Sequence, residues 1–270
     1  MAAPLGLFSV FAFALLLATA SASYPYAREV FSYSGAKGPS HWGHLSSNYS
    51  ACSNGKIQSP INVVKNQTVL NKGLTPLTQD YHPANATLGN NGVTVAINFE
   101  EEVGALMVGN KKYSLKQIHW HTPSEHYLDG VHHAAEMHVL HKANDGSIAV
   151  AAVLYHYGKP DPFLQKINKR LVQLGQETSG LDKESRIALG LFTPKGIIRS
   201  TSKYYRYIGS TTTPPCIEKV VWNILGEVRT ISKEQVQALR APLYSDCKSN
   251  CRPVQPLNGR KIELYDNLSH

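Results

Sequence analysis

Short stretches with strand character follow one another through the middle of the chain, and this pattern most limits the folds open to it. The expected strands are residues 93–99, 105–108, 113–120, 134–141 and 148–156. Gly109-Asn110 separates the second stretch from the third and predicts a hairpin turn. The last stretch is almost wholly apolar, which is typical of a buried central strand.

Helix signals are few. Asp161-Pro162 has the features of an N-cap and a first helical residue, and predicts a helix that reaches about Gln173. A second helix is expected over residues 232–239, where Ser232 and Gln235 have the spacing of a capping box. Many strands with few helices indicate a mainly β protein with an antiparallel or mixed sheet.

The N-terminus has the features of a secretory signal peptide. Residues 5–19 form an apolar run, and Ala20-Ser21-Ala22 follows as a cleavage site of the A-x-A type. We therefore expect removal of residues 1–22 and one domain over residues 23–270. The run is shorter than the ~20 apolar residues of a membrane span, and no later segment reaches that length. The expected destination is the secretory pathway.

An oxidising secretory pathway favours disulfides between the four cysteines. Cys52, Cys216, Cys247 and Cys251 permit three pairings, among which the sequence alone does not choose. Four N-x-S/T sequons fit the same route and are candidates for glycosylation. They begin at Asn48, Asn66, Asn85 and Asn267.

The formal charge of +8 would suit a binder of nucleic acid or acidic glycan if the charge were concentrated on one face. The basic residues are instead scattered, with no basic run beyond Lys111-Lys112. A solvated, mildly basic surface is the better interpretation, and no nucleic-acid partner is expected. Salt-sensitive binding would support the opposite hypothesis.

Histidine gives the strongest chemical signal. Eight of the twelve histidines lie within residues 119–156. His119 and His121 are two apart on an expected strand, so they share one face of it. His138 lies on the next expected strand. Pairing of these strands would bring three imidazoles around one point.

Three neutral imidazoles with one open position are typical of catalytic zinc, although copper and nickel also bind imidazole. Gln117 and Glu136 share the faces of these histidines and could each accept the second N–H of a ligand ring. The alternative is a set of half-buried histidines with ordinary hydrogen bonds. The pattern H-x-H on one strand and E-x-H on its neighbour favours the metal.

The other histidines of this stretch have ordinary explanations. His132 and His133 are expected in a solvated turn, His141 on the opposite side of its strand, and His126 in a loop with no clear role. Residues 210–216 combine three threonines with two prolines, which is typical of a plain turn. Beside a metal, one of the threonine hydroxyls could orient a bound hydroxide.

These motifs together resemble those of the alpha-class carbonic anhydrases. Residues 117–126 (QIHWHTPSEH) are similar to the first metal motif of that family, and residues 135–141 (AEMHVLH) to the second. The resemblance covers nearly the whole mature chain. Further matching segments are residues 38–42 (GPSHW), 58–62 (QSPIN), 209–215 and 250–256. The sequons and the YYRY segment at residues 204–207 are most similar to the plant branch. This resemblance implies the cell wall as destination, with onward transport to a plastid as the alternative.

The resemblance implies a large, twisted, mostly antiparallel central sheet with a few short helices and a conical zinc site. It implies that His119, His121 and His138 hold the zinc in an enzyme that reversibly hydrates carbon dioxide to bicarbonate and a proton.

The resemblance also assigns roles around the metal. Thr212 matches the threonine that accepts the hydroxide proton and donates to Glu125, with Thr213 beside it. The apolar wall for carbon dioxide would be formed by Leu140, Val150 and Trp222. Secreted members have a disulfide at the positions of Cys52 and Cys216.

Three positions depart from the family pattern. Val93 follows Asn91-Gly92, where the family usually has a proton-shuttle histidine, so we expect turnover limited by proton transfer and helped by buffer. Thr211 replaces a leucine of the pocket. Cys251 replaces an aromatic or small residue, and Cys247 is its candidate partner for a disulfide that closes a short loop.

Some plant relatives on this fold are storage proteins with weak activity, so a storage or binding protein is the alternative. Retention of all three histidines, Glu125 and Thr212 favours catalysis.

Overall fold

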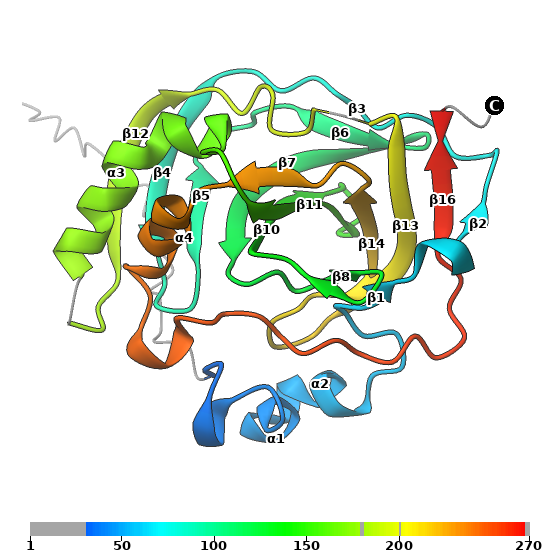
Figure 1. The fold of residues 1–270 in the computed structure, drawn as a ribbon, viewed down its shortest axis with the longest axis horizontal. Helices are drawn as coiled ribbons and strands as arrows, with labels where there is room; N and C mark the ends of the chain where they lie inside the picture. The colour runs from blue at the N-terminus through cyan, green and yellow to red at the C-terminus, as the bar shows by residue number, and fades with distance from the viewer. Residues whose placement is uncertain (1–30, 179–180, 200, 268–270) are drawn as a thin grey trace, which may run out of the picture.

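A thirteen-stranded sheet runs through the described part of the chain (Figure 1). The computed structural model describes residues 31–178, 181–199 and 201–267, so the expected signal peptide lies outside the described residues. The strands follow the order β12-β4-β5-β7-β10-β11-β14-β13-β16-β2, with β15 beside β11, and with β6 joining β7 to β3. Most pairs are antiparallel, while β14 and β15 run parallel to β11 and β2 runs parallel to β16. The predicted mainly β, mostly antiparallel fold is therefore confirmed.

The strands of this sheet are β2 Val69–Leu70, β3 Thr78–Gln79, β4 Ala84–Asn90, β5 Val95–Phe99, β6 Ala105–Val108, β7 Lys111–His121, β10 Ala135–Lys142, β11 Ile148–Tyr157, β12 Ser185–Phe192, β13 Lys203–Ser210, β14 Glu218–Leu225, β15 Arg229–Ile231 and β16 Glu263–Asp266. A second, three-stranded sheet consists of β1 Asn62–Val63, β8 Tyr127–Leu128 and β9 Val131–His132. The helices are α1 Trp42–Leu45, α2 Ala51–Asn54, α3 Pro162–Thr178 and α4 Lys233–Arg240. Four 3₁₀ turns are η1 Gly35–Lys37, η2 Ser47–Tyr49, η3 Lys65–Gln67 and η4 Ser245–Cys247. No helix among these described residues is long and apolar enough to cross a membrane.

Strand β11 lies at the centre of the sheet and is buried on both faces, as its apolar sequence predicts. Its alternate residues belong to two different hydrophobic clusters. Ala149, Ala151 and Val153 pack in the larger cluster, which also includes the apolar side of α3. Val150 and Ala152 pack in the smaller cluster on the other face, next to Trp222. Because side chains alternate along a strand, β11 separates the main core from the layer that supports the site.

Local chemistry explains where two elements differ from their expected bounds. Strand β5 begins at Val95 rather than at Val93, because the Asn91 side chain accepts hydrogen bonds from the amides of Val93 and Thr94 and forms a turn there. Helix α3 continues past Gln173 to Thr178, since Leu174 and Thr178 extend its buried face.

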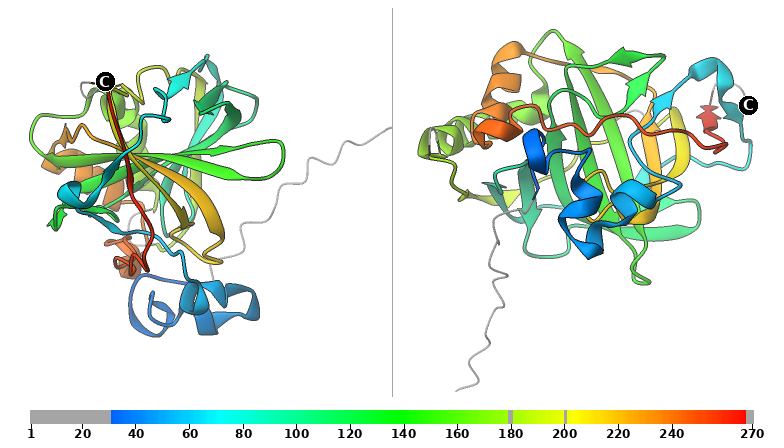
Figure 2. Two further views of the ribbon diagram at one scale, coloured as in Figure 1. Left: turned by 90° about the vertical axis from the view of Figure 1, so that its right-hand side faces the viewer. Right: turned by 90° about the horizontal axis from the view of Figure 1, so that it is seen from below.

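The chain between α4 and β16 crosses the outside of the sheet in an irregular conformation, drawn orange to red in Figure 2. The same views show the strands twisting from one side of the sheet to the other. The N-terminal segment with α1 and α2 lies beside this crossing segment. Trp42 anchors that N-terminal segment, since it is fully buried and packs edge-on against Phe31 and Tyr33.

Candidate metal centre

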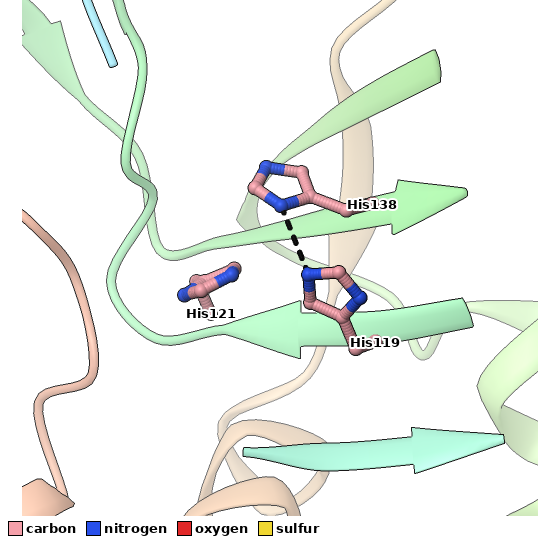
Figure 3. Close-up of side chains that lie close together, drawn as sticks. All are labelled: His119, His121 and His138. Carbon is pink, nitrogen blue, oxygen red and sulfur yellow. Dashed lines mark hydrogen bonds between the residues drawn. The ribbon is translucent and has the colours of Figure 1, made fainter. Parts of the chain in front are cut away.

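His119 and His121 extend from β7, and His138 extends from the neighbouring strand β10 (Figure 3). The register pairs His138 with His119, so both side chains lie on the same face of the sheet. The three rings point toward one another, and one nitrogen of each lies within 4.8 Å of the other two. Nδ1 of His138 is 3.2 Å from Nε2 of His119. The sequence pattern therefore does bring three imidazoles to one point.

Burial makes these rings suitable metal ligands. Removal from water lowers the pKa of His119, His121 and His138, in the case of His121 to about 3, so the rings are neutral at physiological pH. A neutral imidazole offers a lone pair to a metal. Nε2 of His121 is buried and faces the other two rings, and it has no hydrogen-bond partner among the described residues. An orphaned nitrogen among neutral imidazoles fits a bound divalent cation.

Glu136 contacts the nitrogen of His138 that does not face His119. Its Oε1 lies 2.7 Å from Nε2 of His138 and 2.7 Å from Nδ1 of His126. Its Oε2 accepts from the backbone amides of Glu125 and His126 at 2.8 and 2.7 Å. Burial alone would raise the pKa of Glu136, but His126 and His138 hold it well below its usual range. An ionised carboxylate therefore fixes the tautomer of His138.

Gln117 does not contact His119 in the expected way. Its amide donates to Oδ1 of Asn98 at 2.8 Å, and in the part of the chain that the structure describes Nδ1 of His119 has no hydrogen-bond partner. The second nitrogen of His121 is held instead by a residue that sequence reasoning missed. Nδ1 of His121 lies 2.6 Å from the carbonyl oxygen of Asn250. A backbone carbonyl carries no side-chain signature, so only the fold reveals this contact.

His126 joins the site, although no clear role was expected for it. Its Nε2 lies 2.6 Å from the hydroxyl of Tyr207, which in turn is 2.7 Å from Oγ of Ser59. The sequence did contain a signal for these partners. Ser59 and Tyr207 lie in residues 58–62 and 204–207, and both segments resemble motifs of the family. His126, Glu136 and His138 also form a second group with metal-ligand spacing. Their mutual hydrogen bonds already occupy the ligand atoms of that group.

Glu125 and Thr212 lie beside the imidazoles. Oε2 of Glu125 is 3.5 Å from Nε2 of His121, and Oε1 accepts from the backbone amide of Arg252 at 2.9 Å. Burial, followed by repulsion from Glu136, raises the pKa of Glu125, whereas hydrogen bonds from Arg252 and Thr212 act in the opposite direction. When Glu125 is ionised it can only accept, so the Thr212 hydroxyl must donate to it.

A cavity of about 170 Å³ opens in front of the three histidines. Its remaining lining combines polar and apolar residues: Phe31, Asn91, Val93, Thr94, Gln117, Leu140, Val150, Thr211, Thr212, Thr213, Pro214, Val220 and Trp222. All four expected pocket residues and both threonines next to them therefore face one space. The Thr211 hydroxyl is occupied, since it donates to the carbonyl of Thr213 at 3.1 Å and accepts from the amide of Ile217 at 3.0 Å. Thr211 thus adds little free polarity to the apolar wall.

The cysteines pair only once. The expected disulfide between Cys52 and Cys216 is confirmed. The candidate pairing of Cys247 with Cys251 is not formed, because both are free thiols. Cys247 is buried with its thiol 3.6 Å from the Ser32 hydroxyl, whereas Cys251 is only partly buried.

The expectations for His132 and His133 are correct only in part. His132 is exposed as expected, but it belongs to β9 rather than to a turn, and its Nε2 lies 2.7 Å from the carbonyl of Ser124. His133 is half-buried, and its backbone amide donates to the Ser124 hydroxyl. Pairing with the loop after β7, which is invisible in local sequence, orders both. His141 is buried and lies 2.5 Å from the hydroxyl of Tyr81.

Comparisons with known proteins agree with this geometry. A family model described as eukaryotic-type carbonic anhydrase matches residues 37–266. Alpha carbonic anhydrase 7 of Arabidopsis thaliana is 38% identical over 229 residues, which are 85% of this chain and 82% of that protein. A crystal structure of dioscorin complexed with ascorbate has a TM-score of 0.84 and 33% identity, and covers 89% of this chain and 99% of its own. Alpha-carbonic anhydrase from Thermovibrio ammonificans, solved with the inhibitor sulfanilamide, has a TM-score of 0.74 and 36% identity, with coverage of 86% and 98%.

Proposed function

This chain belongs to the eukaryotic-type carbonic anhydrase family, and from this premise we propose that it is a zinc enzyme that reversibly hydrates carbon dioxide to bicarbonate and a proton. The observation that carries the proposal is the convergence of three neutral imidazoles at the floor of a cavity. His119, His121 and His138 would hold the zinc. When bound there, zinc would act as a Lewis acid that lowers the pKa of a coordinated water and supplies a nucleophile at neutral pH.

Thr212 and Glu125 would orient the attacking water. An ionised Glu125 can only accept, so in that state the Thr212 hydroxyl would donate to it and keep its oxygen as an acceptor toward the cavity. A hydrogen bond from the water to this oxygen would direct a lone pair at the substrate. Thr213 lines the cavity next to Thr212 and would complete its polar side.

The apolar side of the cavity suits carbon dioxide, which has no net dipole. Leu140, Val150 and Trp222 line it, and Val150 and Trp222 are almost fully buried. Trp222 donates its N–H to the carbonyl of Ser210 at 2.9 Å, so only its ring surface is presented to the substrate. The apolar wall would hold the substrate beside the threonine hydroxyls without competing for their hydrogen bonds.

Release of the proton would depend on buffer. Val93 lines the cavity, and apart from the three proposed ligands no described lining residue has a side chain that titrates near neutrality. Since an isopropyl group cannot relay a proton, an external base would have to collect it.

Entry into the secretory pathway is part of the same proposal. The disulfide between Cys52 and Cys216 fits an oxidising compartment. The asparagines of the four sequons, Asn48, Asn66, Asn85 and Asn267, are all exposed. Exposure allows glycan attachment, and we propose secretion with the cell wall as destination.

The decisive test is stopped-flow hydration of carbon dioxide by zinc-loaded protein without residues 1–22, in weak and in strong buffer. We expect activity that disappears when a chelator removes the zinc and that rises with buffer concentration. Activity at the uncatalysed rate, with one zinc per chain, would reject the enzyme.

A binding protein is the second candidate, because one similar structure is that of dioscorin complexed with ascorbate. Isothermal titration with ascorbate, performed on the same zinc-loaded sample, separates the candidates. Ascorbate binding together with uncatalysed hydration would favour the binding protein.

A further inference from the structure

A segment without regular secondary structure follows Ser249 and contacts the metal centre from one side. Residues 250–262 form neither helix nor strand, and they cross the molecule between α4 and β16 (Figure 2). Within them, the carbonyl of Asn250 contacts His121 and the amide of Arg252 donates to Glu125. A segment without ladder hydrogen bonds needs side-chain anchors to keep such contacts in register.

Arg252 is such an anchor. Its guanidinium is almost fully buried and donates to three oxygens of α2 and of the segment that joins α2 to β1. The acceptors are the carbonyl of Cys52 at 2.9 Å, Oε1 of Gln58 at 2.7 Å and the carbonyl of Ser59 at 2.9 Å. The same group lies 5.7 Å from the ring centroid of Trp42. A planar guanidinium can satisfy several fixed acceptors at once, which an ammonium group cannot match.

These contacts connect Glu125 to the disulfide. Gln58 also donates to the carbonyl of Cys216 at 3.2 Å, so Arg252 and Gln58 together hold a carbonyl of each bridged cysteine. The three acceptors of the guanidinium are neutral, and burial lowers the pKa of Arg252 to about 10. Burying a charged group is costly, and this cost is offset only if the group is well hydrogen-bonded.

We propose that Arg252 is a positioning residue for the reaction: its guanidinium fixes the irregular segment, and its own backbone amide thereby keeps Glu125 aimed at Thr212. This inference rests on the proposed function, because Glu125 acts there through Thr212. Loss of the guanidinium would let the amide move away from Glu125, while the three histidines would stay on their strands.

Arg260 provides a matched control. Its guanidinium also donates to backbone carbonyls, namely those of Gln58 at 2.8 Å, Pro256 at 2.8 Å, Leu257 at 2.9 Å and Ile208 at 3.1 Å. It likewise lies over an aromatic ring, 5.5 Å from the centroid of Tyr207. The described contacts of Arg260 do not include Glu125 or the histidines. Arg260→Met therefore removes similar anchoring without removing the support of Glu125.

The experiment compares zinc-loaded Arg252→Met, Arg252→Lys and Arg260→Met with the parent protein. We expect Arg252→Met to lower kcat about 10–100-fold with one zinc per chain and little change in KM, as typically follows loss of an outer contact in a metal site. Arg252→Lys should recover part of the loss. Arg260→Met should lower Tm to a similar extent with less than about a twofold change in kcat.

Equal losses of kcat in Arg252→Met and Arg260→Met at matched Tm would overturn the proposal. If Arg252→Met does not fold, Arg252→Lys is compared with Arg260→Lys by the same criterion.

A second readout does not require activity. Cys251 lies between Asn250 and Arg252, and its thiol is partly buried. In a Cys247→Ser background, we expect Arg252→Met to speed labelling of Cys251 by iodoacetamide at least about tenfold, and Arg260→Met to leave it unchanged. Equal rates of Cys251 labelling in Arg252→Met and Arg260→Met would show that Arg252 does not anchor the segment. An inactive parent with this labelling difference would reject the proposed function but not the anchoring role.

Discussion

Val93 contributes a buried isopropyl group to the cavity wall, directly after the Asn91 turn. A histidine side chain placed there would enter the cavity and titrate near neutral pH. We expect Val93→His to raise kcat by about tenfold in weak buffer, because general-base groups that titrate near the working pH transfer protons efficiently. Stopped-flow hydration at several buffer concentrations measures the effect.

The same series contains its own control. In strong buffer the external base already collects the proton, so Val93→His and the parent should converge. A rate in weak buffer that does not exceed that of the parent would show that Val93 does not limit turnover.

Glu136 and Gln117 allow a direct comparison of two expected outer contacts. The carboxylate of Glu136 interacts with His138, His126 and two backbone amides, whereas the Gln117 amide donates to Asn98. We expect Glu136→Gln to weaken zinc binding about 10–100-fold, since it removes the anionic acceptor of a ligand N–H. Gln117→Ala should weaken it less. Competition with a fluorescent chelator measures both, and a larger effect at Gln117 would contradict this geometry.

The two free thiols should react slowly. Burial raises the pKa of Cys247 and of Cys251 to about 11. The thiolate is the reactive form, so at pH 8 only a small fraction of either residue can be alkylated. We expect iodoacetamide labelling to accelerate as the pH rises toward 11, measured by mass spectrometry of peptides from the folded protein. Rapid labelling of Cys247 at pH 7 would show that its surroundings open.

At the scale of single elements, local sequence predicted what local forces determine. The apolar run at β11, the hairpin of β6 and β7 and both helix caps appear as expected, because alternation and capping act over a few residues. The H-x-H and E-x-H patterns located the candidate ligands for the same reason. His126, Asn250 and Arg252 escaped prediction, since their partners lie on segments that only the tertiary fold brings together.

The start of α3 illustrates how a cap can carry more than one role. Oδ1 of Asp161 accepts from the amides of Phe163 and Leu164 at 2.9 Å, and Oδ2 pairs with Arg229 in the interior. Asp161→Ala should cost about 3–5 kcal/mol, because it leaves a buried guanidinium unpaired. Urea denaturation of the zinc-loaded protein measures the loss.

Ser232→Ala is the matched control for this prediction. Ser232 caps α4 by accepting from the amide of Gln235 at 3.2 Å, and no buried charge depends on it. Its loss should cost only about 0.5–2 kcal/mol. Equal costs for the two caps would show that the pair with Arg229 adds nothing to the cap of α3.

At the scale of the whole molecule, the disulfide closes a loop that contains most of the sheet. Cys52 and Cys216 are 164 residues apart, and Cys216 follows the threonines of the cavity. A loop of this length restricts the unfolded chain strongly, so we expect Cys52→Ala/Cys216→Ala to lose about 2–5 kcal/mol of unfolding free energy. Denaturation of the parent under reducing conditions should give the same loss if the effect is the missing bond and not the alanines.

The disulfide should also influence the rate, because the carbonyls of both cysteines are held by Gln58 and Arg252, and Arg252 supports Glu125. We therefore expect the reduced but still folded protein to lose kcat at temperatures well below its Tm, while zinc stays bound to strands β7 and β10. Stopped-flow hydration before and after reduction, with zinc content measured on the same samples, tests this. An unchanged kcat would mean that the bridge stabilises the fold alone and that Gln58 and Arg252 hold the cavity without it.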